Sequence, residues 1–183
     1  KIPDNRRSYI TFLLLYWTGM RVGEMLALTE KDIDLAQQTI SITKSYQRIG
    51  KKDIITPPKT QKSCREIKIP DFLTEKLKKY MEDYTSKDEN DRLFPISKYV
   101  LQSDMREGIK KSGVKNIRIH DLRHSHASLL VEMGFSPLEI SERLGHEKIE
   151  TTLNIYSHLY PDKQSRLAEK LDQEFLKVCK QEK

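Results

Sequence analysis

The stretch that decides the fold begins at His120-Asp121-Leu122-Arg123-His124, continues through Leu144-Gly145-His146 and ends at Tyr156. All five histidines of the chain fall between residues 120 and 158. Arginine offers a planar fork of donors that matches phosphate oxygens. Histidine can donate a hydrogen bond or move a proton near neutral pH, and tyrosine can act as a covalent nucleophile. Together these residue types indicate a site that binds a phosphodiester and attacks it.

Ordinary structural roles would also account for parts of this stretch. His120 and Arg123 are three residues apart, so on a helix they share a face, which is also typical of a solvated helix surface. Tyr156 ends the run Leu153-Asn154-Ile155-Tyr156 and would equally fit a buried aromatic residue. The rest of the chain has to decide between these interpretations.

Zinc binding is a further alternative for the same histidines. His120 and His124 have the i, i+4 spacing of a zinc-binding helix, and His126 is close in sequence. That motif needs a glutamate directly after the first histidine, where this chain has Asp121. Arg123 would also place a fixed positive charge beside the cation. We therefore expect no metal at these histidines.

The composition favours one domain with a polyanionic partner. The chain has 183 residues, enough for a sizeable core, and 33 Lys and Arg against 27 acidic residues give a net charge of +6. Cys64 and Cys179 form no disulfide framework, which fits a reducing cytoplasm. No apolar run approaches the ~20 residues that cross a membrane, and no signal peptide is present. Because Lys1 is not Met, we expect a piece of a longer protein.

The N-terminal part predicts two helices separated by a short break. Apolar residues spaced i, i+3, i+4 and i+7 between Ile10 and Trp17 indicate a buried helix face. Thr18-Gly19 interrupts it, and a second apolar helix begins beside Arg21. Glu24, three residues later on the same face, is placed to orient the Arg21 guanidinium. On its own, Arg21 is equally typical of a surface residue paired with that glutamate.

From Thr39 the hydrophobic period changes to two. Isoleucines at 40 and 42, 54 and 55, and 67 and 69 indicate a small antiparallel three-stranded sheet, with turns near Gly50 and residues 57–63. The segment from Thr43 to Lys68 is strongly basic. Such a charge run discourages aggregation at a sheet edge, and it also suits contact with a DNA backbone. Its cations are Lys44, Arg48, Lys51, Lys52, Lys59, Lys62, Arg65 and Lys68.

Helices resume after Pro70, so the chain is expected to be α+β and mostly helical. Apolar periodicity predicts helices over 73–80 and 101–109, the second closed by Gly113, and a helix from Arg123 to Gly134. Ser136-Pro137-Leu138-Glu139 combines a cap, a first-turn proline and a capping-box glutamate. That helix should end at Gly145, with Thr151 or Thr152 capping the helix that carries Tyr156.

In chain order these pieces resemble the catalytic domain of the tyrosine recombinases, the phage and transposon integrase family. The resemblance covers nearly the whole chain. The family usually carries an N-terminal DNA-binding region before this domain, which we expect outside this chain. The matching stretches are Thr18-Gly19-Met20-Arg21-Val22-Gly23-Glu24, Pro58-Lys59-Thr60 with Ser63 and Arg65, His120-Asp121-Leu122-Arg123-His124, Leu144-Gly145-His146 and Thr151-Thr152-Leu153-Asn154-Ile155-Tyr156.

The resemblance implies a site and a reaction that needs no cofactor. Tyr156 would attack double-stranded DNA and form a 3′-phosphotyrosine, while Arg21, Arg123 and His146 would contact the phosphate. Lys59 would protonate the leaving 5′-oxygen, and His120 would assist as a base or a positioning group. Glu24 would support Arg21. The backbone contacts would come from the remaining basic residues: Lys44, Arg48, Lys51, Lys52, Lys62 and Arg65.

Two other functions stay open at this point. A type IB topoisomerase uses the same chemistry to nick and religate one duplex without exchanging partners. A non-catalytic DNA-binding module would need the basic surface but not the tyrosine and the general acid. The Leu-Gly-His and Thr-Gly-x-Arg stretches resemble integrases more closely than topoisomerases.

The tail predicts a separate helix after a catalytic domain spanning residues 1–161. Within 162–183, an apolar stripe recurs on an otherwise charged helix at Leu167, Leu171, Phe175 and Val178. The stripe would either pack on its own domain or dock into a neighbouring protomer. The family resemblance favours the second, with other protomers joined on DNA in a tetrameric synapse.

Overall fold

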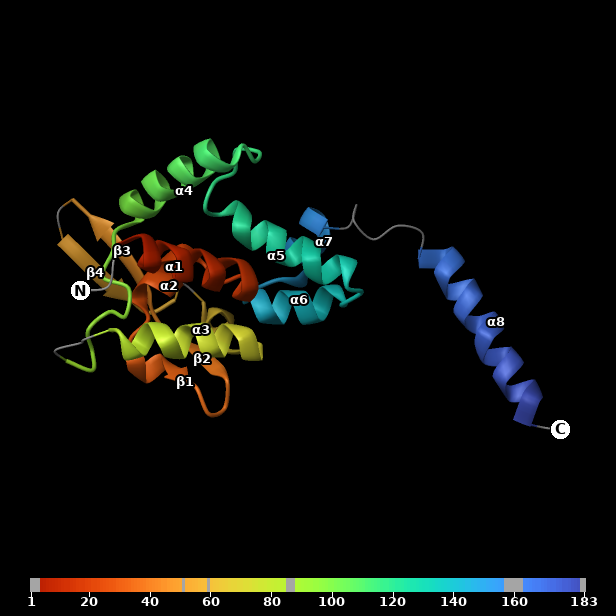
Figure 1. The fold of residues 1–183 in the computed structure, drawn as a ribbon. Helices are drawn as coiled ribbons and strands as arrows, with labels where there is room; N and C mark the ends of the chain where they lie inside the picture. The colour runs from red at the N-terminus through yellow and green to blue at the C-terminus, as the bar shows by residue number, and fades with distance from the viewer. Residues whose placement is uncertain (1–3, 51, 59, 85–87, 157–162, 182–183) are drawn as a thin grey trace.

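The computed structural model describes residues 4–50, 52–58, 60–84, 88–156 and 163–181 (Figure 1). Lys51 and Lys59 lie outside the described residues. The elements in chain order are α1 Asp4–Thr18, α2 Val22–Ala27, the 3₁₀ turn η1 Glu30–Asp32, β1 Ile33–Asp34, β2 Thr39–Ile42, β3 Ser45–Ile49, β4 Lys52–Thr56, the 3₁₀ turn η2 Gln61–Ser63, β5 Arg65–Lys68, α3 Asp71–Glu82, α4 Lys98–Ser112, α5 Asp121–Glu132, α6 Pro137–Leu144, α7 Ile149–Tyr156 and α8 Lys163–Gln181. The mostly helical α+β prediction is confirmed.

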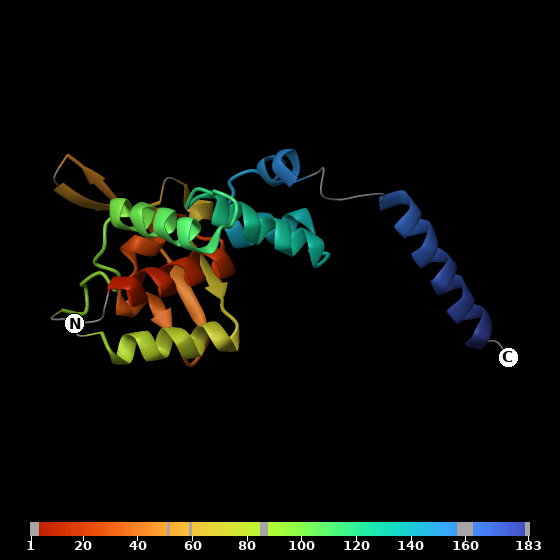
Figure 2. The ribbon, with the colours of Figure 1, turned by 45° about the horizontal axis from the view of Figure 1, so that its top comes forward.

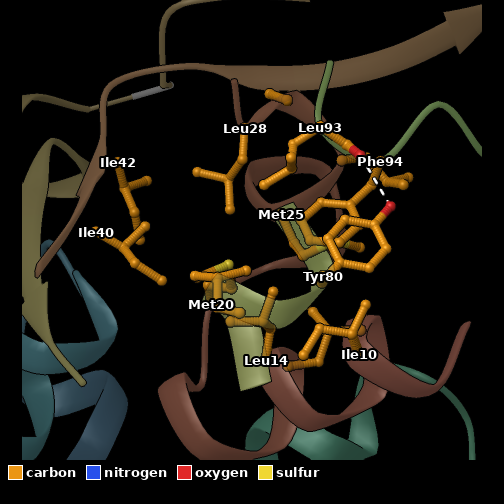
Figure 3. Packing of buried hydrophobic residues seen from close by; sticks show 14 of the residues in the cluster. Ile10, Leu14, Met20, Met25, Leu28, Ile40, Ile42, Tyr80, Leu93 and Phe94 are labelled. Atoms are coloured by element: carbon orange, nitrogen blue, oxygen red, sulfur yellow. Dashed lines mark hydrogen bonds between the residues drawn. The ribbon is translucent and has the colours of Figure 1, made fainter. Parts of the chain in front are cut away.

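The main core surrounds α1, whose apolar face contacts α2, α3, α4 and α5. Leu14 is fully buried at the centre of this helix. Figure 3 shows it among side chains from α2, the sheet and α3, with the Tyr80 hydroxyl donating to the Leu93 carbonyl at 3.0 Å. This core fixes the end of α1 and the start of α2, and with them the position of Arg21.

A second, smaller core joins α5, α6 and α7. Its buried members are Ala127, Val131, Ile140, Leu144 and Tyr156. The tyrosine ring is thus a core residue of this cluster. Its hydroxyl contacts a polar group, Nδ1 of His124.

Gly19 lies where the two cores meet, in the break between α1 and α2. Its φ of +67° belongs to the left-handed region that glycine adopts without a steric penalty. A Cβ atom here would lie 2.6 Å from carbon atoms of both His126 and Leu144, which belong to α5 and α6. The predicted break at Thr18-Gly19 is therefore real, and the absence of a side chain lets α5 and α6 approach it.

The sheet differs from the prediction in its third strand. β1, β2 and β5 form an antiparallel sheet in the order β1-β2-β5, with Ile40 opposite Ile67. β4, which contains Ile54 and Ile55, pairs only with β3, in a two-stranded ribbon. Ile55 is half exposed, so this segment has no buried face to add to the sheet. Figure 1 shows the ribbon projecting from the edge of the body.

Contacts of Tyr46 hold the β3–β4 ribbon in a fixed position. Tyr46 of β3 lies under the Arg92 guanidinium, 4.0 Å from ring centroid to Cζ. The Tyr46 hydroxyl also donates to Asp53 of β4 at 2.9 Å. The body is therefore joined to the ribbon near its base, while the turn at Gly50 extends away from it.

Most helix ends follow the predicted caps. Ser136 and Glu139 form the capping box of α6, and Gly113 and Gly145 close α4 and α6 with φ of +69° and +67°. The cap predicted at Thr151 or Thr152 is wrong, because α7 already begins at Ile149. Thr152 is buried within α7, and its hydroxyl contacts His146 instead of capping the helix.

The tail helix α8 lies away from the rest of the described chain in both views (Figures 1 and 2). Leu167, Leu171 and Phe175 of its apolar stripe are 52%, 62% and 67% exposed. Packing of this stripe on its own domain is therefore not the arrangement in this structure. Among the described residues, no helix combines the length and apolar character needed to cross a membrane.

Candidate active site

The site is built on the C-terminal end of α6. The last carbonyls of a helix lack partners within the helix and carry its negative dipole, so they favour cations. Here three consecutive carbonyls each accept from a different arginine, drawn from three separate parts of the fold. The pairs are Arg65 Nε to Arg143 O at 2.8 Å, Arg123 Nη2 to Leu144 O at 2.8 Å and Arg21 Nη2 to Gly145 O at 3.4 Å.

One buried carboxylate joins two of these arginines. Glu24 accepts from Arg21 Nη1 at 2.7 Å and from the Arg21 backbone N–H at 2.8 Å. The oxygen that accepts from the backbone N–H, Oε2, also accepts from Arg65 Nη2 at 2.9 Å. Burial alone would raise the pKa of Glu24, but the hydrogen bonds and charge of Arg65, together with the hydrogen bonds of Arg21, outweigh it and lower the pKa. Glu24 is therefore ionised and holds both guanidinium groups.

Arg123 is held from two sides. It is 5% exposed, and its Nη1 donates to the Gly19 carbonyl at 2.7 Å. Its Nη2 donates to the Leu144 carbonyl at the end of α6. Burial, and then the nearby Arg21 charge, lower its pKa to about 9, so the group stays cationic at pH 7. Within the described part of the chain two of its five N–H donors are used, which leaves others to meet a ligand.

His146 follows α6 directly and is oriented by Thr152. Its Nδ1 lies 2.8 Å from the Thr152 hydroxyl. Burial, followed by the charges of Arg123, Arg21 and Arg65, lowers the pKa of His146 to about 4. The ring is therefore neutral at pH 7. When Thr152 donates to Nδ1, the ring hydrogen of His146 lies on Nε2. This N–H can then donate a hydrogen bond to an anion.

Tyr156 is 3% exposed, and its hydroxyl lies 2.8 Å from Nδ1 of His124. Burial raises the pKa of Tyr156, while the Arg123 charge acts in the opposite direction. The interaction of Tyr156 with His124 is absent from the sequence-based site. No local sequence signal could have found it, because the contact joins residues 32 apart and depends on how α7 packs on α5.

His120 lies at the surface just before α5. Its ring meets the His124 ring edge-on, with centroids 4.9 Å apart. Burial, then His124 and Arg123, lower its pKa. His120 therefore stands behind His124 rather than in hydrogen-bond contact with the tyrosine in the described part of the chain.

The zinc alternative gains no support from the arrangement of the histidines. His126 is buried and its Nε2 accepts from Arg143 Nε at 3.0 Å, apart from the His120–His124 pair. Among the residues the structure describes, no group of three His, Cys, Asp or Glu side chains is placed to hold a metal ion.

The residues expected to contact DNA divide into two groups. Arg48 and Lys52 on the β3–β4 ribbon and Lys62 in η2 are exposed, whereas Lys51 falls outside the described residues. Lys44 is paired with Asp32 at 2.7 Å, and this internal ion pair does not favour contact of Lys44 with DNA. DNA contact by the exposed residues stays a prediction.

Arg65 is the clearest departure from the expected surface position. Its side chain is 7% exposed and is occupied by Glu24 and the α6 end. The chain around Gly145 passes so close that a Cβ atom there would lie 2.8 Å from Arg65 Nη1. Little of this guanidinium is open to a DNA backbone, and its contacts are those of a residue that positions Arg21.

The assembled groups suit a phosphate. Arg21, Arg65 and Arg123 contribute three positive charges, whereas Glu24, which contacts Arg21 and Arg65, contributes one negative charge. The site therefore carries excess positive charge, and burial strengthens its electrostatic effect. A neutral histidine with a free donor and a tyrosine hydroxyl lie alongside. Such a set can hold a phosphodiester, stabilise added negative charge and deliver a nucleophile.

Comparison with known proteins identifies relatives of this chain. The model of the phage integrase family matches residues 1–163. The integrase of ICEBs1 from Bacillus subtilis is 36% identical over 93% of this chain and 50% of its own length. The integrase of Staphylococcus phage L54a is 31% identical over 85% of this chain and 49% of its own length. The chain thus spans about half the length of the curated relatives it matches.

Solved structures show the same fold. The Tn1549 transposon integrase, in complex with transposon right end DNA, superposes with a TM-score of 0.76 at 22% identity, covering 92% of this chain and 59% of that one. The catalytic domain of bacteriophage HP1 integrase gives a TM-score of 0.58 at 22% identity over 87% of this chain and 79% of that one.

Replacing the buried carboxylate should destabilise the protein. Glu24→Gln leaves Arg21 and Arg65 without a counter-charge, which typically costs about 3–5 kcal/mol of unfolding free energy. Because the pKa of Glu24 is lowered on folding, its ionic contribution is present above the ordinary pKa of 4.5 and is lost as pH falls through the lowered value. The difference between the native chain and Glu24→Gln in denaturant titrations should therefore shrink in acid.

Glu66→Gln is the matched control, since Glu66 is exposed on β5 beside the same arginine in sequence. Its unfolding free energy should stay close to that of the native chain. Equal losses for the two variants, or a Glu24→Gln difference that persists unchanged into acid, would show that the carboxylate does not hold the arginines.

Proposed function

The chain belongs to the phage integrase family, and on that premise we propose that it is the catalytic domain of a tyrosine-type site-specific recombinase. It cleaves and rejoins double-stranded DNA of a mobile element through a 3′-phosphotyrosine intermediate. The observation that carries the proposal is the position of Arg21, Arg123 and His146 at one helix end, beside a buried Tyr156. The cytoplasm, where its DNA is found, is its place of action.

In the proposed reaction the arginines hold the scissile phosphate. The free donors of Arg21 and Arg123 take the non-bridging oxygens, and His146 donates from Nε2 to the same group. As Tyr156 attacks, negative charge accumulates on these oxygens, and prearranged donors stabilise it without reorganising. The attack leaves the phosphate on the tyrosine and releases the 5′-hydroxyl.

The leaving group needs a proton, which we assign to Lys59. The neighbours of Lys59 in the sequence, Pro58 and Thr60, line a pocket together with Arg21 and Gly145, which supports the assignment. A free lysine has a pKa of about 10.4, and a cationic site lowers it and eases the transfer. The arginine charges serve the purpose that a metal ion serves elsewhere, so no cofactor takes part. The phosphotyrosine conserves the bond energy, so religation needs no ATP.

The basic ribbon and neighbouring loop would bind the DNA backbone. Arg48, Lys52 and Lys62 are exposed on that side, and their charges would fix the duplex without reading its sequence. Lys51 would join them. Exchange of strands between partner sites, rather than relaxation of one duplex, distinguishes this proposal from topoisomerase activity.

Assembly with other protomers, in a tetrameric synapse on DNA, would use α8. Its exposed apolar stripe has no partner among the described residues, and a short helix next to a polar connector is readily exchanged between identical chains. A pocket of about 660 Å³ between α1, α3, α5 and α6 offers a complementary apolar surface. Its apolar lining includes Trp17, Phe72, Leu130, Met133 and Phe135.

The test of the proposed function is covalent capture. Incubated with nicked duplexes whose sequence around the nick is randomised, the native chain should form an adduct that survives denaturation. Tyr156→Phe should bind the duplexes equally well and form none, because only the hydroxyl is lost. Adducts that persist in this variant, mapped by mass spectrometry to another tyrosine, would refute the assignment. Transfer of the captured strand to a second duplex should follow.

Lys59→Ala should slow cleavage far more than it weakens binding. Loss of a general acid typically costs about 10²–10⁴-fold in rate. A substrate with sulfur as the leaving 5′-atom needs no proton and should restore most of the rate. Lys62→Ala is the control, with weaker binding and no gain from sulfur. Absence of sulfur rescue in Lys59→Ala would show that this lysine only binds the backbone.

Deleting residues from Ser165 onward should leave the domain folded, because the stripe of α8 is exposed. Recombination should fall more than cleavage of a single site, since only assembly loses a contact. Circular dichroism checks the fold, and strand-exchange and adduct assays run in parallel compare the two activities. An unfolded truncated chain, or one that recombines at the full rate, would contradict docking between protomers.

A further inference from the structure

We propose that His124 is the group that accepts the proton of Tyr156 as its hydroxyl becomes the nucleophile. The proposal deepens the function assigned above and rests on it. It adds to the site a catalytic histidine that contacts a reacting atom directly. The role given to His120 on resemblance then becomes that of a neighbour that supports His124.

The geometry that carries this inference is one short contact across the smaller core. The Tyr156 hydroxyl and Nδ1 of His124 are 2.8 Å apart, joining α7 to α5. A general base has to be within hydrogen-bond reach of the proton it removes, and this distance meets that requirement before any substrate binds. Because Tyr156 is 3% exposed, bulk water has little access to its hydroxyl.

His120 is less well placed for the same task. The hydrogen bonds among the described residues connect the Tyr156 hydroxyl to His124, whereas His120 meets the His124 ring edge-on at 4.9 Å. This contact limits rotation of the His124 ring and keeps Nδ1 directed at the tyrosine. His120 therefore acts on the nucleophile through His124.

The charges around His124 come from every element packed against it. These are His120 just before α5, Asp121 and Arg123 on α5, His146 after α6 and Tyr156 on α7. A neutral imidazole with its hydrogen on Nε2 presents an unprotonated Nδ1 to the hydroxyl, which is the form that accepts a proton.

The step balances within the site. The bond from Tyr156 Oη to phosphorus forms, the bond from phosphorus to the 5′-oxygen breaks, and the tyrosine proton passes to His124 Nδ1. The 5′-oxygen takes its proton from Lys59. Religation reverses each transfer, so the imidazolium of His124 returns the proton to the departing tyrosine. No oxidant, metal or further reactant enters.

The test isolates nucleophile activation from leaving-group protonation. The probe is an oligonucleotide with a 3′-(4-nitrophenyl) phosphate, annealed into a duplex, because nitrophenolate leaves without a proton. His124→Ala and His124→Asn should each slow nitrophenol release by about 10²–10⁴-fold with unchanged binding of the probe duplex. Asn is informative because its amide can keep a hydrogen bond near the Nδ1 position yet accepts no proton. Near-native release by His124→Asn would overturn the proposal in favour of positioning alone.

A second readout separates a base from a structural residue. Replacing Tyr156 by 3,5-difluorotyrosine, whose hydroxyl ionises more readily, should accelerate His124→Ala by a factor at least ten times larger than it accelerates the native chain. His120→Ala is the matched control and should show a smaller defect without this selective gain. Selective rescue of His120→Ala instead would make His120 the base and overturn the proposal.

A measurement on the unsubstituted chain does not depend on any variant folding. The ¹⁵N shifts of His124 should show an unprotonated Nδ1 at pH 7 in the free protein and a protonated ring in the trapped phosphotyrosine complex. A hydrogen on Nδ1 in the free protein would contradict the proposal. Failure of the native chain to form any adduct would overturn the proposed function as well, whereas native adducts with unimpaired His124 variants would overturn this inference alone.

Discussion

Three arginines on three successive carbonyls at the end of α6 are the interaction on which the site depends. Arg65 comes from β5, Arg123 from α5 and Arg21 from the start of α2, so one helix end connects the sheet to both cores. A free helix C-terminus would be satisfied by water. Here its carbonyls accept hydrogen bonds from guanidinium groups. Each guanidinium uses some of its N–H donors for contacts within the protein, and the other donors can bind a ligand.

This arrangement accumulates more positive charge than the protein neutralises. Glu24 compensates part of it and fixes Arg21 and Arg65 in place. Burial, together with the same charges, keeps His146 neutral, so that it can donate to a phosphate without repelling the arginines beside it. A phosphodiester supplies the missing negative charge, which explains why a site with no described metal-binding cluster suits phosphate chemistry.

Much of the fold could be predicted because its signals are local. The capping box at Ser136 and Glu139 and the glycine at 145 depend on neighbours in sequence, and the structure confirms both. The third strand of the sheet could not be predicted. The adjacent β-branched residues Ile54 and Ile55 indicate a strand but not its partner, and the choice of β1 over β4 depends on burial that only the folded chain establishes.

The same limit applies to the site. The order of Arg21, Arg123, His146 and Tyr156 indicated the chemistry, but sequence does not separate an exposed cation from one in an internal ion pair. Arg65 and Lys44 therefore seemed equivalent to their exposed neighbours. The contact of His124 with a tyrosine 32 residues away depends on how α7 packs on α5, which no local pattern encodes.

The central claim is that Arg21, Arg123, His146 and Tyr156 converge on a single phosphate. The most direct measurement is a crystal structure of the chain with cleaved duplex ends and orthovanadate, which mimics the five-coordinate transition state of phosphoryl transfer. The account predicts vanadium bonded to Tyr156 Oη, with both arginines and His146 Nε2 donating to its equatorial oxygens. Vanadate bound away from the end of α6, with Tyr156 still hydrogen-bonded to His124, would contradict it.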